Sequence, residues 1–191
     1  MKDVILYSND ELTNSLKRLD INSWYDALNY IKHLPYGRNA NRYDLSLVIN
    51  EGHGTCSSKH AFLKQIADLN EIKDVHLILG MYKMNARNTP LVGQVLKTYH
   101  LDYIPEAHCY LNIGKKNIDL TTRESKFSDL KNDIISELII KPNQVNEYKV
   151  KYHQLFLKDW LIKNGKNNLD NQLSFDAIWN IREQCIKNLS K

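Results

Sequence analysis

One segment determines most of what this sequence predicts: Glu51-Gly52-His53-Gly54-Thr55-Cys56-Ser57-Ser58-Lys59-His60. Its two glycines allow a tight backbone turn. The apolar residues that follow recur at helical spacing: Phe62, Leu63, Ile66 and Leu69. Cys56 therefore stands at the start of a predicted helix, where unpaired N–H groups and the helix dipole favour a thiolate. Taken alone, this segment fits either a nucleophilic cysteine or a small buried hydrophobic one.

Composition is that of an ordinary soluble globular protein. The 191 residues, 42% hydrophobic and 25% charged, suffice to bury a core without disulfides. The net charge of +4 comes from scattered basic residues, which argues against a nucleic-acid partner. Three separated cysteines and an N-terminal apolar run too short for a signal peptide favour a cytoplasmic location. No stretch approaches the length of a membrane span.

The flanking sequence predicts a single α+β domain over residues 1–191, with a motif-bearing core at about 50–122 and a C-terminal helical elaboration at about 142–190. Two N-terminal helices are expected within 9–33, capped by Asn9 or Asp10 and by Ser23. Residues 45–49 fit a short strand or an extended approach to Asn50, whereas 121–141 fit helix or strand equally. The other expected elements are strands over 75–83, 107–113 and 116–120 and helices over 91–99, 143–164 and after Ser174.

A hairpin predicts the second half of the site. Gly114-Lys115 fits the centre of a type II′ turn, which would pair Leu111 with Ile118. Alternation then gives one apolar, core-facing side and one polar side: Cys109, Leu111, Ile118 and Leu120 on the first, and His108, Tyr110 and Asp119 on the second. Asp119 is diagonal to His108, so the two side chains should meet. A one-residue slip would bury Asp119 without a partner, so burial also sets the register.

Cys56, His108 and Asp119 together form a constellation for thiol acyl transfer. His108 would take the thiol proton and later donate it to the leaving group, while Asp119 would orient the imidazole and stabilise its cation. The imidazolium and the helix end would lower the thiol pKa below its usual value of about 8.5. Singly, His108 and Asp119 would be interpreted as solvated surface residues. Their combination with Cys56 favours catalysis.

Two segments resemble the transglutaminase-like superfamily. Gly54-Thr55-Cys56-Ser57-Ser58-Lys59-His60-Ala61 is similar to its nucleophile segment, and His108-Cys109-Tyr110-Leu111-Asn112-Ile113 with Ile118-Asp119-Leu120-Thr121 is similar to its His-x-aromatic and Asp-Pro-Thr strands. The resemblance covers about 52–121. It implies a papain-like fold, with N-terminal helices that include the nucleophile helix packed on a small antiparallel sheet. It also implies a Cys-His-Asp triad acting without a cofactor on a peptide, protein or small amide. Tyr110 replaces the usual Trp and Leu120 the usual Pro, which bears on the substrate class.

Other residues near these motifs are candidates for supporting roles. Asn50, six residues before Cys56, would either help the Cys56 N–H bind an oxyanion or make a turn. His60, one helical turn after Cys56, could contact the thiol, although a packed and hydrogen-bonded histidine is preferred. Further cleft candidates are Tyr36, Arg38, Arg42 and Tyr110. Tyr36, Arg38 and Arg42 could line a cleft that binds an acidic or carboxylate group, although a solvated loop is the preferred explanation for them.

Two other functions remain open at this stage. Cys56, His60, His108 and Cys109 contain enough ligand atoms for zinc, but the hairpin register points Cys109 away from His108. Cys56, His60 and His108 could still hold one metal ion, although the usual paired-ligand spacing is absent. A non-catalytic binding module could also use this fold. We prefer a thiol enzyme that hydrolyses an amide over one that cross-links, because water needs no second binding site.

Overall fold

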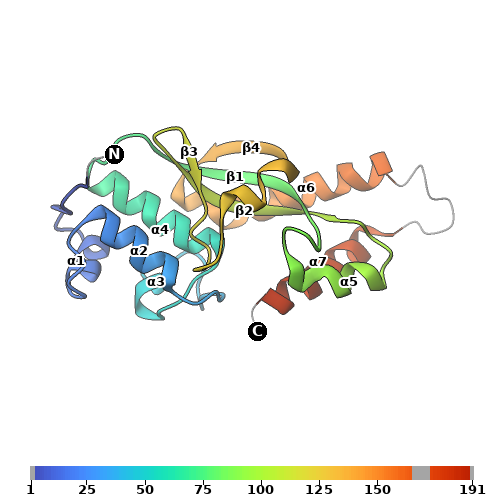
Figure 1. Ribbon diagram of the computed structural model, residues 1–191, viewed down its shortest axis with the longest axis horizontal. Coiled ribbons are helices and arrows are strands. Elements are labelled where there is room, and N and C mark those ends of the chain that lie inside the picture. The colour runs from blue at the N-terminus through green and yellow to red at the C-terminus, as the bar shows by residue number, and fades with distance from the viewer. Residues whose placement is uncertain (1–2, 165–172, 190–191) are drawn as a thin grey trace.

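The computed structural model describes residues 3–164 and 173–189 and has an α+β architecture, with helices packed on a four-stranded antiparallel sheet (Figure 1). The strand order is β3-β2-β1-β4. β1 (Val75–Met84) and β2 (Ile104–Ile113) pair along their whole lengths. β4 (Ile134–Ile140) pairs with the other edge of β1, and the short β3 (Lys116–Ile118) pairs with the end of β2. The sheet is therefore centred on β1 and β2.

Four helices precede the sheet in the chain: α1 (Glu11–Lys17), α2 (Trp24–His33), α3 (Leu47–Asn50) and α4 (Cys56–Leu69). The predicted caps are confirmed, since Asp10 accepts from the Thr13 N–H and Ser23 from the Asp26 N–H. α4 packs on β1 and β2. It buries Phe62, Leu63 and Ile66 completely in the main core.

The start of α4 is fixed by local chemistry. Thr55 and Ser58 form a capping box, in which each side chain bonds the backbone N–H of the other. Gly54 has no space for a side chain, because a Cβ there would lie 2.8 Å from Ser58 Oγ. Gly52 turns the chain with a φ of +66°. Cys56 is consequently the first residue of the helix, as predicted.

The C-terminal half builds a second core beyond the end of the sheet. Its helices are α5 (Gly93–Thr98), α6 (Glu147–Asn164) and α7 (Phe175–Leu189). In Figure 1 they lie at the opposite end of the molecule from α1 and α2. Side chains from these helices and the strand ends form a second cluster: Met84, Leu96, Ile104, Leu157, Ile178, Ile181 and Cys185. No helix in the described ranges is long and apolar enough to cross a bilayer.

The hairpin register is confirmed, with Leu111 opposite Ile118 and Cys109 in the main core. The predicted turn type is wrong, because Gly114 (φ +53°) and Lys115 (φ +71°) both have the positive φ of a type I′ turn. The twist of a type I′ turn matches that of the paired strands. The third strand also ends at Ile118, before the predicted Leu120.

Two further segments differ from, or complete, what the sequence predicts. Residues 45–49 are not a strand, because α3 forms there after Asp44 accepts the N–H and O–H of Ser46. The ambiguous 121–141 segment contains two 3₁₀ turns, Phe127–Asp129 and Lys131–Asp133, followed by β4. Two more 3₁₀ turns, Pro90–Val92 and Pro142–Val145, precede α5 and α6.

Candidate active site

The structure brings Cys56, His108 and Asp119 together where α4 meets β2. β3 pairs only with residues 111–113, so the edge of β2 at Cys109 is left for the start of α4. The Cys109 backbone N–H and the His108 ring both interact with the Cys56 sulfur. Nε2 of His108 lies 2.8 Å from Oδ2 of Asp119. The thiol, imidazole and carboxylate thus stand in the order that the sequence predicts.

Two hydrogen bonds from Thr121 fix the orientation of the Asp119 carboxylate. Its second oxygen, Oδ1, accepts the Thr121 N–H at 2.9 Å and the Thr121 O–H at 2.5 Å. Burial works to raise the pKa of Asp119, but the neighbouring His108 outweighs it and holds that pKa well below the usual range. The carboxylate is therefore ionised and oriented toward His108.

The charges around the thiol favour a thiolate–imidazolium pair. Burial works to raise the pKa of Cys56, but the positive charges of Lys149 and His108 outweigh burial and lower it to about 6. Burial works to lower the pKa of His108, but Asp119 and Cys56 raise it well above 6.5. At neutral pH the sulfur is consequently ionised and the ring protonated.

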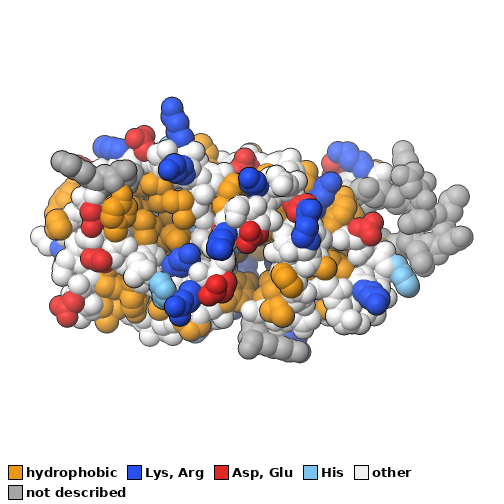
Figure 2. All heavy atoms as spheres, viewed as in Figure 1, with side chains coloured by type: hydrophobic (Ala, Val, Ile, Leu, Met, Phe, Trp, Pro, Cys, Tyr) orange, Lys and Arg blue, Asp and Glu red, His pale blue; other side chains and the backbone are white. Residues whose placement is uncertain are grey.

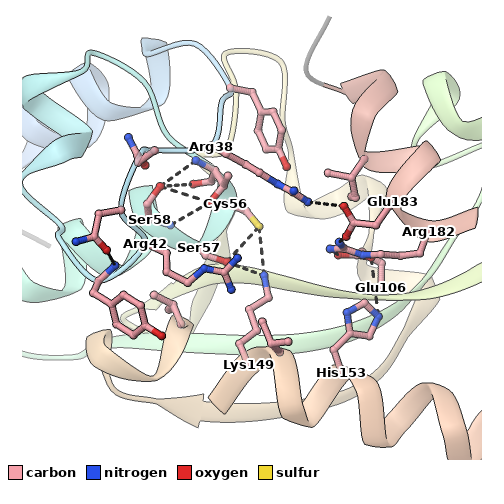
Figure 3. Close-up of a pocket in the computed structure, with 18 of the residues that line it drawn as sticks. Arg38, Arg42, Cys56, Ser57, Ser58, Glu106, Lys149, His153, Arg182 and Glu183 are labelled. Atoms are coloured by element: carbon pink, nitrogen blue, oxygen red, sulfur yellow. Dashed lines mark hydrogen bonds and ion pairs between the residues drawn. The ribbon is translucent and has the colours of Figure 1, made fainter. Parts of the chain in front are cut away.

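Lys149, near the start of α6, is a site residue that the sequence analysis missed. Its Nζ donates to Ser57 Oγ at 2.6 Å and lies 3.8 Å from Cys56 Sγ (Figure 3). Lys149 precedes Tyr152 and Phe156, both packed on the main core, by three and seven residues. This spacing puts it on the buried face of the helix. A lysine on an apolar helix face is the signal that could have identified it.

His60 is a packed histidine, as the sequence analysis prefers. Its Nδ1 donates to the Cys56 carbonyl at 2.7 Å, and its Nε2 accepts the Leu120 N–H at 2.8 Å. Burial lowers its pKa to about 4, so the ring is neutral. Lys59 parallels it by donating to the carbonyls of Leu34 and Thr121. Both side chains tie α4 to the segment that carries Asp119, a positioning role that the motif spacing does not predict.

Two cavities meet at the sulfur, and we name each by a feature of its lining. The cation-lined cavity, about 600 Å³, includes Arg42, Ser57 and Lys149. The His108 cavity, about 420 Å³, includes His108 and Asp119. Four residues line both: Tyr36, Cys56, Glu106 and Ile186. Figure 2 shows a small hollow near the middle of one face of the molecule, between the end that carries α1 and α2 and the end that carries α5 and α7. Cys56 as a residue is only 8% exposed, but it lines both cavities.

A second buried charge cluster joins β2 to α7 along the cation-lined cavity. Glu106 accepts Arg182 Nε at 2.7 Å and Nη2 at 2.6 Å (Figure 3). Burial works to raise the pKa of Glu106, but Arg182 outweighs it and lowers the pKa to about 2. Arg38 is paired with Glu183 of α7 at 3.0 Å. The C-terminal elaboration therefore forms a wall of the site, which the sequence analysis assigned to residues 50–122.

The cleft candidates divide into two groups. Tyr36, Arg38 and Arg42 line the cavities, so the solvated-loop explanation is incomplete for them. Tyr110 lines neither, since its hydroxyl donates to Glu137 and its ring packs 4.8 Å from that of Phe127. His60 also lines neither cavity. Of the five candidates, the three from the 36–43 loop can therefore touch a substrate.

Asn50 is not placed beside the thiol. It ends the short helix α3, is exposed, and donates to Ser46 Oγ at 3.3 Å. It lines neither cavity. The oxyanion role was predicted from the number of residues between Asn50 and Cys56. The intervening glycine turn does not bring the Asn50 side chain close to the Cys56 sulfur. The alternative reading, an Asn that hydrogen-bonds locally, fits its contacts.

The zinc site considered above is not assembled. Within residues 3–164 and 173–189, no three His, Cys, Asp or Glu side chains are arranged to hold a metal ion. Both ring nitrogens of His60 are occupied by backbone groups, and His108 is engaged with Asp119. The four suggested ligands therefore have other partners.

Comparison of the chain with protein-family models, with curated proteins and with solved structures gave no significant match. The resemblance to the transglutaminase-like superfamily stays a prediction from the two motifs.

Proposed function

We propose that this chain is a thiol-dependent acyl-transfer enzyme of the transglutaminase-like type. The main support for the proposal is that His108 interacts with both Cys56 and Asp119, and that Cys56 lines two cavities. A thiol with a pKa of about 6 beside a protonated imidazole is a nucleophile poised at neutral pH. A buried structural cysteine has no need of either feature.

In the proposed reaction the Cys56 thiolate attacks an amide or other acyl carbonyl. His108 donates its proton to the leaving amine as the tetrahedral intermediate collapses to a thioester. His108, now neutral, takes a proton from water or from an acceptor amine, which attacks the thioester and releases the acyl group and the thiolate. Asp119 keeps the ring oriented and stabilises its cation in both steps. We favour water as the acceptor.

The oxyanion of this reaction needs donors near the sulfur. The Cys56 N–H belongs to the first turn of α4, where a helix cannot satisfy its own donors. Tyr36 lines both cavities, and its backbone bridges to that of Gly54, two residues before the nucleophile. Burial and the charge of Cys56 keep the pKa of Tyr36 far above its usual value, so its hydroxyl stays a donor. We assign Tyr36 the role that the sequence analysis considered for Asn50.

The test uses an activated ester, such as p-nitrophenyl acetate, with purified protein. We expect a burst of p-nitrophenolate and an acetyl group on Cys56 by peptide mass spectrometry, with Cys109 and Cys185 unmodified as internal controls. His108→Gln should reduce the acylation rate at least about a hundredfold. A folded protein whose Cys56 acylates no faster than free cysteine would contradict the proposal and fit a non-catalytic binding module.

A further inference from the structure

The two cavities that meet at Cys56 differ in charge. The cation-lined cavity has four basic side chains (Arg38, Arg42, Lys149 and Arg182) and two acidic ones, Glu106 and Glu183. Apart from the residues that both cavities share, the His108 cavity has three carboxylates (Asp119, Glu124 and Asp129) against two cations, Lys126 and the protonated His108. A substrate that spans the sulfur therefore meets positive charge on one side and negative charge on the other.

Two of the basic side chains have no carboxylate partner within the described residues. Arg182 is paired with Glu106, and Arg38 with Glu183. Lys149 is bonded to Ser57 and faces the sulfur, and no ion pair of the described chain includes Arg42. Figure 3 shows the Arg42 guanidinium extending toward Ser57 and the Lys149 ammonium. Two cations thus point into the same part of the cavity without an ion pair to a carboxylate of the described residues. Lys149 faces the Cys56 thiolate and is also influenced by Glu106, so Arg42 is the cation that is more available to a ligand.

The reaction geometry decides which part of a substrate enters which cavity. His108 must lie beside the leaving amine in order to protonate it. His108 lines only the smaller cavity, so the leaving group belongs there. The acyl chain points away from the leaving group at a tetrahedral carbon, and the space beyond the sulfur on that side is the cation-lined cavity. Its volume of about 600 Å³ is that of a small-molecule or peptide subsite.

We propose that the cation-lined cavity binds a carboxylate carried by the acyl part of the substrate, with Arg42 as its main anchor and Lys149 beside it. The preferred substrates are then amides of dicarboxylic acids, or peptides with an acidic group on the acyl side of the scissile bond. This assignment rests on the proposed function for its direction, because the leaving group is placed by His108. The existence of an anion site, by contrast, depends only on the charged side chains of the cavity and not on the reaction.

The test compares iodoacetate with iodoacetamide, two alkylating reagents of similar size of which only the first is an anion. Second-order rate constants at Cys56 are measured by mass spectrometry, and their ratio is the readout. Because His108 and the thiolate are common to both rates, Arg42→Gln should lower the iodoacetate-to-iodoacetamide ratio about three- to tenfold. Lys151→Gln removes an exposed positive charge from α6, the helix that carries Lys149; it is the control and should leave the ratio unchanged. An unchanged ratio in Arg42→Gln overturns the anion site.

A second comparison separates this inference from the proposed function. The p-nitrophenyl monoester of glutaric acid carries a carboxylate that the butyric ester lacks. Turnover of both esters with no preference that depends on Arg42 would overturn the anion site and leave the acyl-transfer proposal standing. No turnover of either ester, together with an Arg42-dependent preference for iodoacetate, would overturn acyl transfer and leave the anion site. Failure of Cys56 to react with either alkylating reagent would overturn both, since the cavities would then not admit small molecules to the sulfur.

Discussion

Nζ of Lys149 lies 3.8 Å from Sγ of Cys56, although the two residues are 93 positions apart in the chain. The thiol therefore faces two cations, Lys149 and His108, where a Cys-His-Asp triad requires one. The lysine differs from the histidine because its charge persists after the ring has given up its proton. In the proposed acyl-enzyme, His108 is neutral until it takes the proton of the attacking water. Lys149 keeps its positive charge beside the sulfur throughout, so it can also stabilise the thiolate that departs in the last step.

Replacing Lys149 by methionine should raise the pKa of Cys56 by about 1 unit or more, because the largest of the influences that lower it is removed. The measurement is the pH dependence of iodoacetamide alkylation at Cys56. Lys151→Met, on an exposed face of the same helix, serves as the control and should leave the midpoint unchanged. If Lys149→Met and wild type share one midpoint, the lysine does not act on the thiol.

Replacing Thr121 by valine should slow acylation about tenfold and cost about 1–2 kcal/mol of stability. The hydroxyl that donates to Asp119 Oδ1 is lost, so one oxygen of a buried carboxylate keeps only the Thr121 N–H. Acylation by an activated ester and urea unfolding measure the two effects. Thr122→Val is the matched control, because the Thr122 hydroxyl bonds Ser125 and not the triad. Equal acylation rates in wild type and Thr121→Val would remove Thr121 from the positioning of Asp119.

The sequence predicted the parts of the site that local rules determine. The turn at Gly114-Lys115 and the alternation along β2 set the hairpin register, and Thr55 and the glycines set the start of α4. The same rules could not place Lys149 beside Cys56. The two residues meet only because α6 packs against the site, and no sequence motif near Lys149 indicates that packing. A residue three or four positions along a helix, or across a tight hairpin, can be placed from sequence, whereas one brought close by the packing of a distant element cannot.

The incorrect predictions have the same origin. Asn50 was placed by counting residues back from Cys56, but α3 directs its side chain to Ser46. α3 has four residues, too few to show a period, so a helix could not be told from a strand. The solvated interpretation, which applied to His108 and Asp119 only when each was taken singly, does not fit the structure, because both residues are buried and the Tyr82 ring lies 5.8 Å from that of His108.

The stability of the protein should fall as the pH drops from about 6.5 to about 4. His60 is neutral in the folded state, with a pKa of about 4, whereas an unfolded histidine gains a proton near pH 6.5. The unfolded state then binds more protons, and His60 alone accounts for about 3 kcal/mol of lost stability over this window. His153, whose pKa is also lowered by burial, adds in the same direction.

The check is urea unfolding between pH 4 and pH 7 for wild type and His60→Gln. Glutamine cannot titrate, so the variant should be less stable at pH 7 but have a flatter pH dependence than wild type. His33→Gln, on the exposed end of α2, controls for the loss of an ordinary histidine. Parallel curves for wild type and His60→Gln would show that His60 is not held neutral.

The central claim is that Cys56 and His108 form an ion pair in the resting protein. The pH dependence of Cys56 alkylation by iodoacetamide measures it directly, with the labelled residue identified by mass spectrometry. We predict a midpoint near 6 in wild type and a midpoint displaced toward the usual thiol value of about 8.5 in His108→Gln. A wild-type midpoint near about 8.5 that His108→Gln does not move would contradict the claim.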